Sequence, residues 1–547
     1  MNPDLPDDFI SMWVADQDFA CAPPILEAMK KRLERRVLGY SIILDPTYKQ
    51  SVVNWMKRRH GWTTKANQFI FTAGVVRAVD IAVETLTKKG EGVILNTPAY
   101  HPFEDIPKKK ERKLVLSPLL CDEKGYYTVN YDELEKLCQD PNNKLFIFCN
   151  PHNPTGRVWK KEEIRKVADI CFKHNIFIVS DEIHSDLLRL DQYHIPLGKL
   201  YPNEKRMIVC TAPSKTFNLA ANALSNIYVP DPEMRNQWEA GFLGGFPSPL
   251  SMEACKAAYN ECEPWLEQLR VYLDANFKLL ADRLQKELPE AVHYRSEGTY
   301  LAWIDFTKLG FSDDELKRRI TRAGVFIEYA SDFVANGENH VRMNLSCPRS
   351  LLDEAITRIV NALKNNYESP QFQGQLKQDN KFPAEQVKLQ INQSGKTVVY
   401  FLRHFACPLT RLVFRDIELH ASEYESKKIP VHLFINSSEE YYNKYLAQSK
   451  LTVPSFVTVH FDLKGEFYDI VHAGCAKNRN CLVDRPTFAA LDLAEDLEYI
   501  EYENEPGVRS LQRPATFIIS NDGNVSFAKY GHGAGDVPSS EELLKLL

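Results

Sequence analysis

The sequence lacks any long hydrophobic run, and none approaches the roughly 18 consecutive apolar residues that a membrane-spanning helix needs. Its first residues, MNPDLPDDFISMW, also lack the basic start and apolar centre of a secretory signal. We therefore predict a cytoplasmic protein that has no membrane partner.

An excess of charge of one sign is missing as well. Lys and Arg number 67 and Asp and Glu 73, which gives a formal net charge of −6. Proteins that bind nucleic acid carry a basic excess, so no nucleic-acid partner is expected. The 12 cysteines are spread over 547 residues, and this spread favours reduced thiols over a disulfide framework.

The chain does contain alternating strand-like and helix-like segments between about residues 65 and 230. Apolar runs such as 145–149 and 176–180 are typical of buried parallel strands. Residues 160–175, between them, repeat apolar side chains at helical spacing. This order predicts an α/β domain with a large doubly wound sheet and a site at the carboxyl ends of its strands. Residues 290–363 mix strands and helices and predict a smaller α+β subdomain.

A polar stretch rich in Gln, Asn and Lys, at 367–386, is the best linker candidate. The apolar run TVVYFL at 397–402 then restarts the strand pattern. We predict a first domain at 1–366, a linker at 367–394 and a second domain at 395–547.

Three motifs each follow a predicted strand: NPHNPTG at 150–156, SDEIHSD at 180–186 and SKTFNLAA at 214–221. The rigid turn of the first would position Asn153 to donate to an aromatic hydroxyl. Asp181 could pair with a protonated pyridine nitrogen, and Lys215 could form a Schiff base and move a proton. Each motif alone is common, but together, in this order, they predict a site for pyridoxal 5′-phosphate (PLP).

Residues 10–365 resemble the fold-type I, aminotransferase-like PLP enzymes, and are most similar to the MalY/PatB branch of cystathionine β-lyases. The stretches that carry the resemblance beyond these motifs include MWVADQDF at 12–19, PAYHPF at 98–103, EGTYLAW at 297–303 and VRMNLSCPRS at 341–350. It implies a fold-type I PLP-dependent transferase fold for the first domain.

The resemblance also implies roles for single residues. Tyr100 would stack on the pyridine ring, and Asn153 and His184 would hydrogen-bond its phenolic oxygen. Arg342 would clamp the α-carboxylate of an amino-acid substrate through a two-pronged ion pair.

The phosphate would be held at a helix start. Gly74, Val75 and Val76 would offer free backbone N–H groups, and Ser214 would add a hydroxyl. Tyr40 resembles a tyrosine that reaches the phosphate from the other subunit, which implies a homodimer.

The sequence departs from the pattern of the family in three places. Ala223 stands eight residues after Lys215, where many aminotransferases have a phosphate-binding arginine, and this favours the lyase branch. Gln17 stands where the branch often has Met. Glu328, with Tyr329 and Ala330, replaces the usual loop near the substrate.

We predict a PLP-dependent C–S β-lyase that converts a cysteine-derived thioether or disulfide to a thiol, pyruvate and ammonia. An aminotransferase needs the same residues up to the loss of the Cα proton and is the first alternative. An inactive scaffold with this fold is the second.

Residues 395–547 resemble thioredoxin-fold proteins of the peroxiredoxin-like (AhpC/TSA) group, through VVYFLRHFACPLTR and RPATFIISNDGNV. Cys407, at a predicted helix start with basic neighbours, would favour a thiolate, and Pro514 matches the cis-proline of that fold. Cys475 and Cys481 are candidates to resolve a disulfide, whereas their spacing does not suit zinc. A thiol-redox role and a fold kept for binding or stability both remain open.

Overall fold

The computed structural model describes residues 5–41 and 45–547. The chain divides into two compact units. The N-terminal unit comprises Ile10–Ile320 and Val325–Asn365, and the C-terminal unit comprises Met1–Phe9, Thr321–Gly324 and Asn366–Leu547. No helix in the described ranges combines the length and the hydropathy that crossing a membrane requires.

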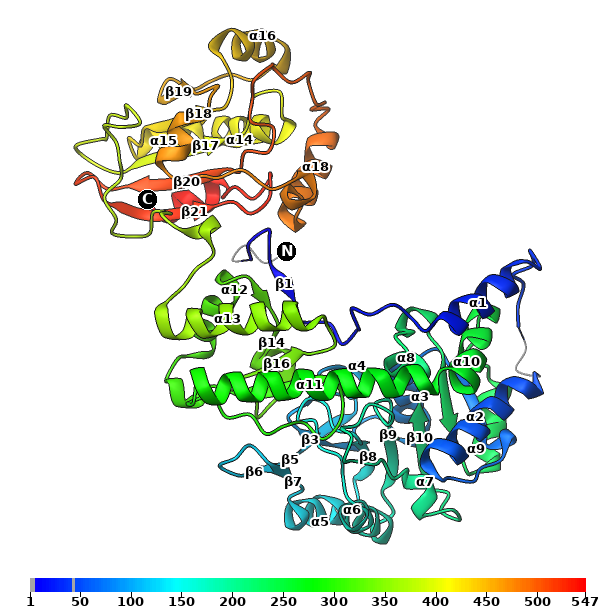
Figure 1. The fold of residues 1–547 in the computed structure, drawn as a ribbon. Helices are drawn as coiled ribbons and strands as arrows, with labels where there is room; N and C mark the ends of the chain where they lie inside the picture. Colours follow the sequence, from blue (N-terminus) through cyan, green and yellow to red (C-terminus); the bar gives the residue numbers. More distant parts are fainter. Residues whose placement is uncertain (1–4, 42–44) are drawn as a thin grey trace. The chain divides into compact units, whose positions relative to one another are not determined.

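A seven-stranded sheet forms the centre of the N-terminal unit (Figure 1). Its strands lie in the order β2 (Phe69–Thr72), β11 (Ser225–Tyr228), β10 (Met207–Thr211), β9 (Phe177–Asp181), β8 (Asn143–Cys149), β3 (Gly92–Thr97) and β5 (Lys113–Pro118). The strands from β10 to β5 are parallel, and β11 is antiparallel to both of its neighbours.

Both faces of this sheet are buried, which explains why its strands are almost wholly apolar. Along β8, Leu145 and Ile147 enter one hydrophobic cluster with helix α3 (Val75–Leu86). Phe146 and Phe148 enter another cluster on the opposite face, with α6 (Lys161–Lys173). The carboxyl ends of the parallel strands therefore meet at one edge of a sheet covered on both sides.

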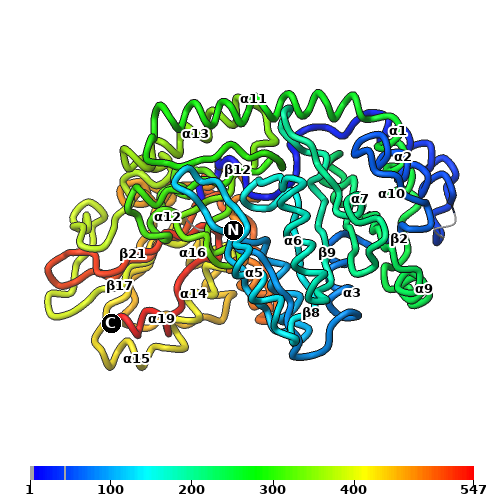
Figure 2. Tube along the Cα trace, turned by 90° about the horizontal axis from the view of Figure 1, so that it is seen from below, coloured from blue at the N-terminus to red at the C-terminus, as the bar shows by residue number. Residues whose placement is uncertain are grey.

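A smaller antiparallel sheet completes this unit, in the order β12 (Leu301–Asp305), β16 (His340–Asn344) and β14 (Glu328–Tyr329). Helix α11 (Glu263–Glu287) runs from beside α10 (Pro249–Glu261) to beside α13 (Arg349–Asn365), as Figures 1 and 2 both show. The predicted doubly wound sheet and α+β subdomain are both present.

The C-terminal unit has a five-stranded mixed sheet, in the order β19 (Val457–Phe461), β18 (Val431–Ile435), β17 (Thr397–Leu402), β20 (Ala515–Ile519) and β21 (Val525–Tyr530). It buries apolar side chains on both faces. Phe382 and Val387, from the segment that we expected to be a linker, are buried in one of these clusters. Three cis X-Pro bonds occur in the described residues and none of them precedes Pro514, so the predicted cis-proline is wrong.

Candidate active site

A cavity of about 400 Å³ lies at the carboxyl ends of the parallel strands of the N-terminal unit; we call it the strand-end cavity. Nearly all the residues predicted to bind the cofactor or substrate line it: Gly74, Val75, Val76, Tyr100, Asn153, Asp181, His184, Ser214, Lys215 and Arg342. These residues come from strands, turns and helix starts spread over some 270 positions, and the sheet brings them together.

Lys215 lies on the short helix α8 (Pro213–Thr216), directly after β10. Its Nζ donates to the backbone oxygen of Ala15 at 2.7 Å. Burial lowers the pKa of its amine, because a low-dielectric site disfavours the ammonium form. Gln17 donates from Nε2 to the backbone oxygen of Lys215 at 2.7 Å, and the next residue, Thr216, donates from Oγ1 to buried Asp186 at 2.9 Å. Hydrogen bonds thus hold the amine of Lys215, its backbone oxygen and the residue that follows it.

Asp181 is the last residue of β9 and is buried. Its Oδ1 accepts the backbone N–H of Ile183 at 3.1 Å, but burial dominates and raises the pKa of the carboxyl to about 7. Burial lowers the pKa of His184 to about 3, so that its imidazole is neutral at physiological pH. Its Nδ1 is buried and has no hydrogen-bond partner within the described chain.

Arg342 lies on β16 and is 2% exposed. Its Nη1 donates to Oδ1 of Asn153 at 3.0 Å, and its Nη2 donates to the backbone oxygen of Trp13 at 3.2 Å. Nη2 also forms an ion pair with the carboxylate of Glu328. The predicted substrate arginine therefore already holds one carboxylate, from this chain.

Helix α3 begins at one side of the cavity. Gly74, its N-cap, has φ +98° and ψ 156°, a conformation that glycine alone adopts readily. No side chain in the described part of the chain caps the helix, so its first N–H groups are available to an anion. Ser225 on β11 lines the same cavity, and its buried Oγ has no partner in the described residues. This serine was not predicted.

These residues fit PLP. The carboxylate of Asp181 suits the ring nitrogen, Lys215 suits the aldehyde carbon, and the start of α3 suits the phosphate. The orphaned polar atoms of His184 and Ser225 are the kind that a bound polar group satisfies.

One predicted cofactor residue lies apart. Tyr40 does not line the strand-end cavity; its side chain is 93% exposed, with its ring 5.7 Å from that of Phe246.

Two groups that hold the site were missed by sequence reasoning: the backbone oxygens of Trp13 and Ala15. The stretch MWVADQDF contributed to the family resemblance. The type of a residue does not indicate what its backbone oxygen binds, because every residue has one.

The C-terminal unit has a smaller cavity, of about 240 Å³, that contains Cys407. Cys407 is the N-cap of helix α14 (Pro408–Leu419), and Nη1 of Arg403 lies 3.0 Å from its Sγ. His404 is 1% exposed, lines this cavity, and has an unpartnered Nδ1 among the described residues. Burial lowers the pKa of its imidazole to about 3.

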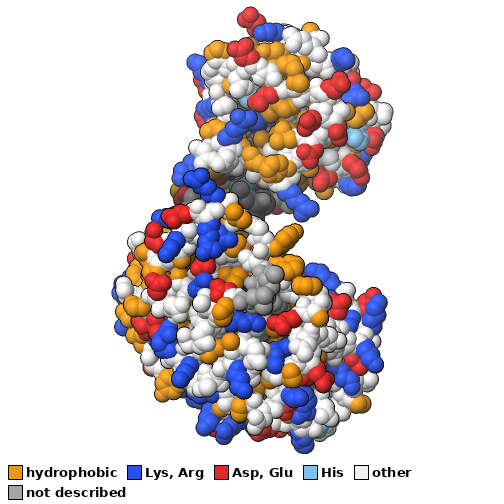
Figure 3. All heavy atoms as spheres, turned by 90° about the vertical axis from the view of Figure 1, so that its right-hand side faces the viewer, with side chains coloured by type: hydrophobic (Ala, Val, Ile, Leu, Met, Phe, Trp, Pro, Cys, Tyr) orange, Lys and Arg blue, Asp and Glu red, His pale blue; other side chains and the backbone are white. Residues whose placement is uncertain are grey.

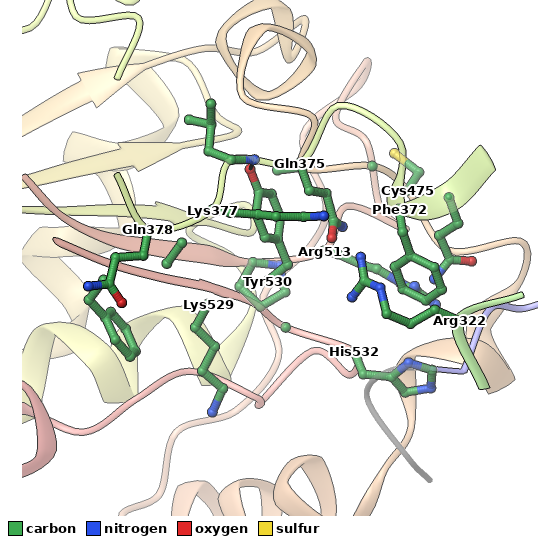
Figure 4. Close-up of a pocket in the computed structure, with 18 residues that line it drawn as sticks. Arg322, Phe372, Gln375, Lys377, Gln378, Cys475, Arg513, Lys529, Tyr530 and His532 are labelled. Carbon is green, nitrogen blue, oxygen red and sulfur yellow. Dashed lines mark hydrogen bonds between the residues drawn. The ribbon is translucent and has the colours of Figure 1, made fainter. Parts of the chain in front are cut away.

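A separate cavity of about 430 Å³ in the same unit contains Cys475 (Figure 4). The figure labels Cys475, Phe372 and Arg513 among the residues that line it, and Cys407 is not one of the described lining residues. Cys481 instead packs against the apolar cluster that includes Cys407. Of the two candidate resolving cysteines, Cys481 has the more suitable position.

The comparisons with known proteins concern the N-terminal unit. The family model for aminotransferase class I and II matches residues 8–359. Cystathionine β-lyase PatB of Bacillus subtilis (strain 168) is 37% identical over 65% of this chain and 93% of its own length.

Two solved structures are similarly related. The PLP-bound C–S lyase of Staphylococcus hominis is 37% identical, with a TM-score of 0.63, over 66% of this chain and 92% of its own. The PLP-bound putative aminotransferase of Clostridium difficile 630 is 40% identical, with a TM-score of 0.63, over 65% of this chain and 93% of its own. The predicted cofactor and the predicted fold of this domain are confirmed.

Proposed function

Because this chain belongs to the aminotransferase class I and II family, with MalY/PatB-type cystathionine β-lyases among its relatives, we propose that it is a PLP-dependent C–S β-lyase. It would cleave the Cβ–S bond of a cysteine-derived thioether or disulfide. A thioether would release a thiol and a disulfide a persulfide, and water would convert the remaining three-carbon fragment to pyruvate and ammonia. The observation that carries the proposal is the convergence of Lys215, Asp181 and Arg342 on one cavity.

Three residues of the cavity would each have a separate role in the reaction. Arg342 would bind the α-carboxylate of the substrate and so fix the direction of the Cα–H bond. Lys215 would take the Cα proton on Nζ, and its lowered pKa suits a base that must be neutral before transfer. Asp181 would hold the proton of the ring nitrogen. PLP supplies the electron sink for the negative charge that develops on Cα.

The decisive experiment incubates the purified holoenzyme with an S-substituted cysteine, without keto acid, and measures pyruvate and free thiol together. A β-lyase gives equal amounts of both, and Lys215→Ala should lower the rate by about 10³-fold or more, since it removes the proton-transfer group. Turnover that appears only after a keto acid is added would instead establish an aminotransferase. That alternative is favoured by the likeness to the C. difficile protein.

We also propose that the protein is a homodimer in which Tyr40 completes the phosphate site of the partner. Several apolar side chains on residues 37–40 and 242–246 are exposed: Val37, Leu38, Tyr40, Phe242 and Phe246. The rings of Tyr40 and Phe242 both lie close to that of Phe246, at 5.7 and 5.2 Å. Figure 3 shows that hydrophobic side chains (orange) reach the surface on the face that it draws. Neighbouring exposed apolar side chains are typical of an interface. Light scattering that gave a monomeric mass for the holoenzyme would refute this assignment.

For the C-terminal unit we propose a thioredoxin-like fold and a thiol-exchange role. The proposal is supported by the guanidinium of Arg403, placed 3.0 Å from the sulfur of Cys407 at a helix start. Cys407 Sγ would attack the S–S bond of a small disulfide or persulfide. A new S–S bond forms as the old one breaks, and the leaving thiolate takes up the proton that Cys407 has lost, so no outside oxidant is needed.

Mass spectrometry of the protein after exposure to cystine tests this role. The expected result is one added cysteine on Cys407, which Cys407→Ser abolishes and Cys475→Ser preserves. If Cys407 stays unmodified while other thiols react, the fold serves binding or stability instead.

A further inference from the structure

The charged side chains among the described residues that line the Cys407 cavity are Arg403, Arg479 and Glu501. Arg479 and Glu501 are exposed and form an ion pair, with 3.7 Å between Nη2 and Oε2, so their charges offset each other. Arg403 instead has its Nη1 3.0 Å from Sγ of Cys407, and its Nη2 donates to the backbone oxygen of Ser510 at 2.5 Å. Within the described chain, no carboxylate offsets the charge of Arg403.

A second guanidinium acts on the same cysteine from inside the protein. Arg411, on α14, is 1% exposed and lies near enough to Cys407 for their charges to interact. Its Nη2 donates to the backbone oxygen of Ile500, and its Cζ lies 4.1 Å from the centre of the Tyr502 ring. It too has no carboxylate partner in the described ranges. Because a buried charge without a counter-charge is costly, the two guanidinium groups favour two negative charges nearby, and a thiolate at Cys407 supplies only one.

Two buried nitrogen atoms of residues that line this cavity have no hydrogen-bond partner in the described part of the chain. They are Nε of Arg403 and Nδ1 of His404, a side chain that is 1% exposed. The imidazole is neutral, since burial lowers its pKa to about 3, and a neutral imidazole can carry its proton on Nδ1. Nε belongs to the same guanidinium as the Nη1 beside Sγ, so an acceptor bound to Nε would lie next to the sulfur.

We propose that the Cys407 cavity selects small disulfides and persulfides whose carbon chain carries a carboxylate. The carboxylate would accept from Arg403 and His404 and supply the second negative charge. Sγ of Cys407 then forms a bond to one sulfur of the ligand, the S–S bond of the ligand breaks, and the departing thiolate takes up a proton. Cystine, and the persulfide that the proposed lyase would release from it, belong to this class. The inference rests on the proposed thiol-exchange role and adds the class of substrate.

Two alkylating reagents test the selection without any exchange of disulfides. Iodoacetate and iodoacetamide both form an Sγ–CH₂ bond and expel iodide, and they differ only in a carboxylate in place of a carboxamide. Peptide mass spectrometry of the full chain gives both rate constants at Cys407, and their ratio cancels the reactivity of the thiol itself. The iodoacetate to iodoacetamide ratio should be about tenfold or more higher in the native protein than in urea, the effect of one charged hydrogen bond.

The variants locate the effect. Arg403→Gln should return the ratio to its value in urea, whereas Arg403→Lys, which keeps the charge, should retain part of the preference. Arg415→Gln removes the same charge from a residue of α14 that pairs with Glu418 and lies outside the cavity, and it should leave the ratio unchanged. A native wild-type ratio equal to that in urea, or native Cys407 that reacts with neither reagent, overturns the inference whether or not the variants fold.

A pair of disulfides separates this inference from the thiol-exchange proposal. 3,3′-Dithiodipropionate and its diamide differ in the same way, and the native protein should form the mixed disulfide at Cys407 about tenfold faster with the dicarboxylate. If the preference for iodoacetate holds but neither disulfide reacts, the carboxylate subsite stands and only the exchange proposal fails. If both disulfides react at equal rates, exchange stands and the selection by carboxylate is wrong.

Discussion

The charge states of single residues in the strand-end cavity are set chiefly by burial. The carboxyl of Asp181 has few partners, and its pKa is raised to about 7. His184, in the same cavity, is driven the other way and stays neutral. Burial disfavours the charged form of either group, and the pyridine nitrogen of PLP supplies the partner that Asp181 lacks.

The raised pKa of Asp181 makes the stability of the PLP-free protein depend on pH. Between about pH 4 and pH 7 native Asp181 keeps a proton that the unfolded chain has lost, so the contribution of this group to stability falls as pH rises. Relative to Asp181→Asn, the free energy of unfolding of the PLP-free wild type should fall by about 3 kcal/mol from pH 5 to pH 8. Urea denaturation of both proteins at each pH measures the free energy of unfolding. If the two proteins show the same pH dependence, the prediction is wrong. Loaded with PLP, the wild type should lose most of this dependence.

Arg342 allows a second prediction at this scale. Arg342→Lys keeps the positive charge but loses the planar fork that matches a carboxylate. We expect KM for an S-substituted cysteine to rise about tenfold or more, with a smaller change in kcat. Steady-state kinetics decides this, and an unchanged KM would mean that the α-carboxylate binds elsewhere.

At the scale of elements, the start of α3 and the ends of the strands create the site. The backbone turns from β2 into α3 at Gly74, which has a positive φ and, as a glycine, no side chain that could cap the first N–H groups of the helix. Any side chain there is strained although the surrounding space is open.

We therefore expect Gly74→Ala to weaken PLP binding about tenfold, because the helix start must shift to relieve the strain. Absorbance titration of the apoenzyme with PLP measures the change. Gly90→Ala is the matched control: Gly90 also has a positive φ and open space, but lies outside the cavity. Equal losses of PLP affinity in the two variants would show that strain in general, and not the phosphate site, is responsible.

At the scale of the whole molecule, the chain is two units, each with its own sheet and its own buried clusters. Every described residue that lines the strand-end cavity belongs to the N-terminal unit. The Cys407 cavity belongs to the other.

A protein truncated after Asn365 should accordingly bind PLP and keep kcat/KM within about threefold of the full chain, since the three clusters that support its site are intact. The absorbance of bound PLP and the pyruvate assay test this. Loss of both, in a truncated protein that remains folded by circular dichroism, would show that the C-terminal unit is needed for the first site.

The type and order of the residues were sufficient to predict much of the site and the central sheet. Asn153, Asp181 and Lys215 were found because each follows an apolar run, and strand ends of a parallel sheet meet at one edge. The pattern of apolar runs likewise gave the doubly wound sheet, since strands buried on both faces must be apolar throughout.

Only the tertiary structure showed which groups of distant segments form hydrogen bonds and ion pairs with one another. The backbone oxygens of Trp13 and Ala15, which hold Arg342 and Lys215, are groups that every residue possesses. Glu328 looked like a departure in a loop, and its pairing with Arg342 exists because β14 and β16 lie side by side. Motifs record the side chains that chemistry requires, whereas contacts between distant segments depend on strand register and packing, which no local pattern encodes.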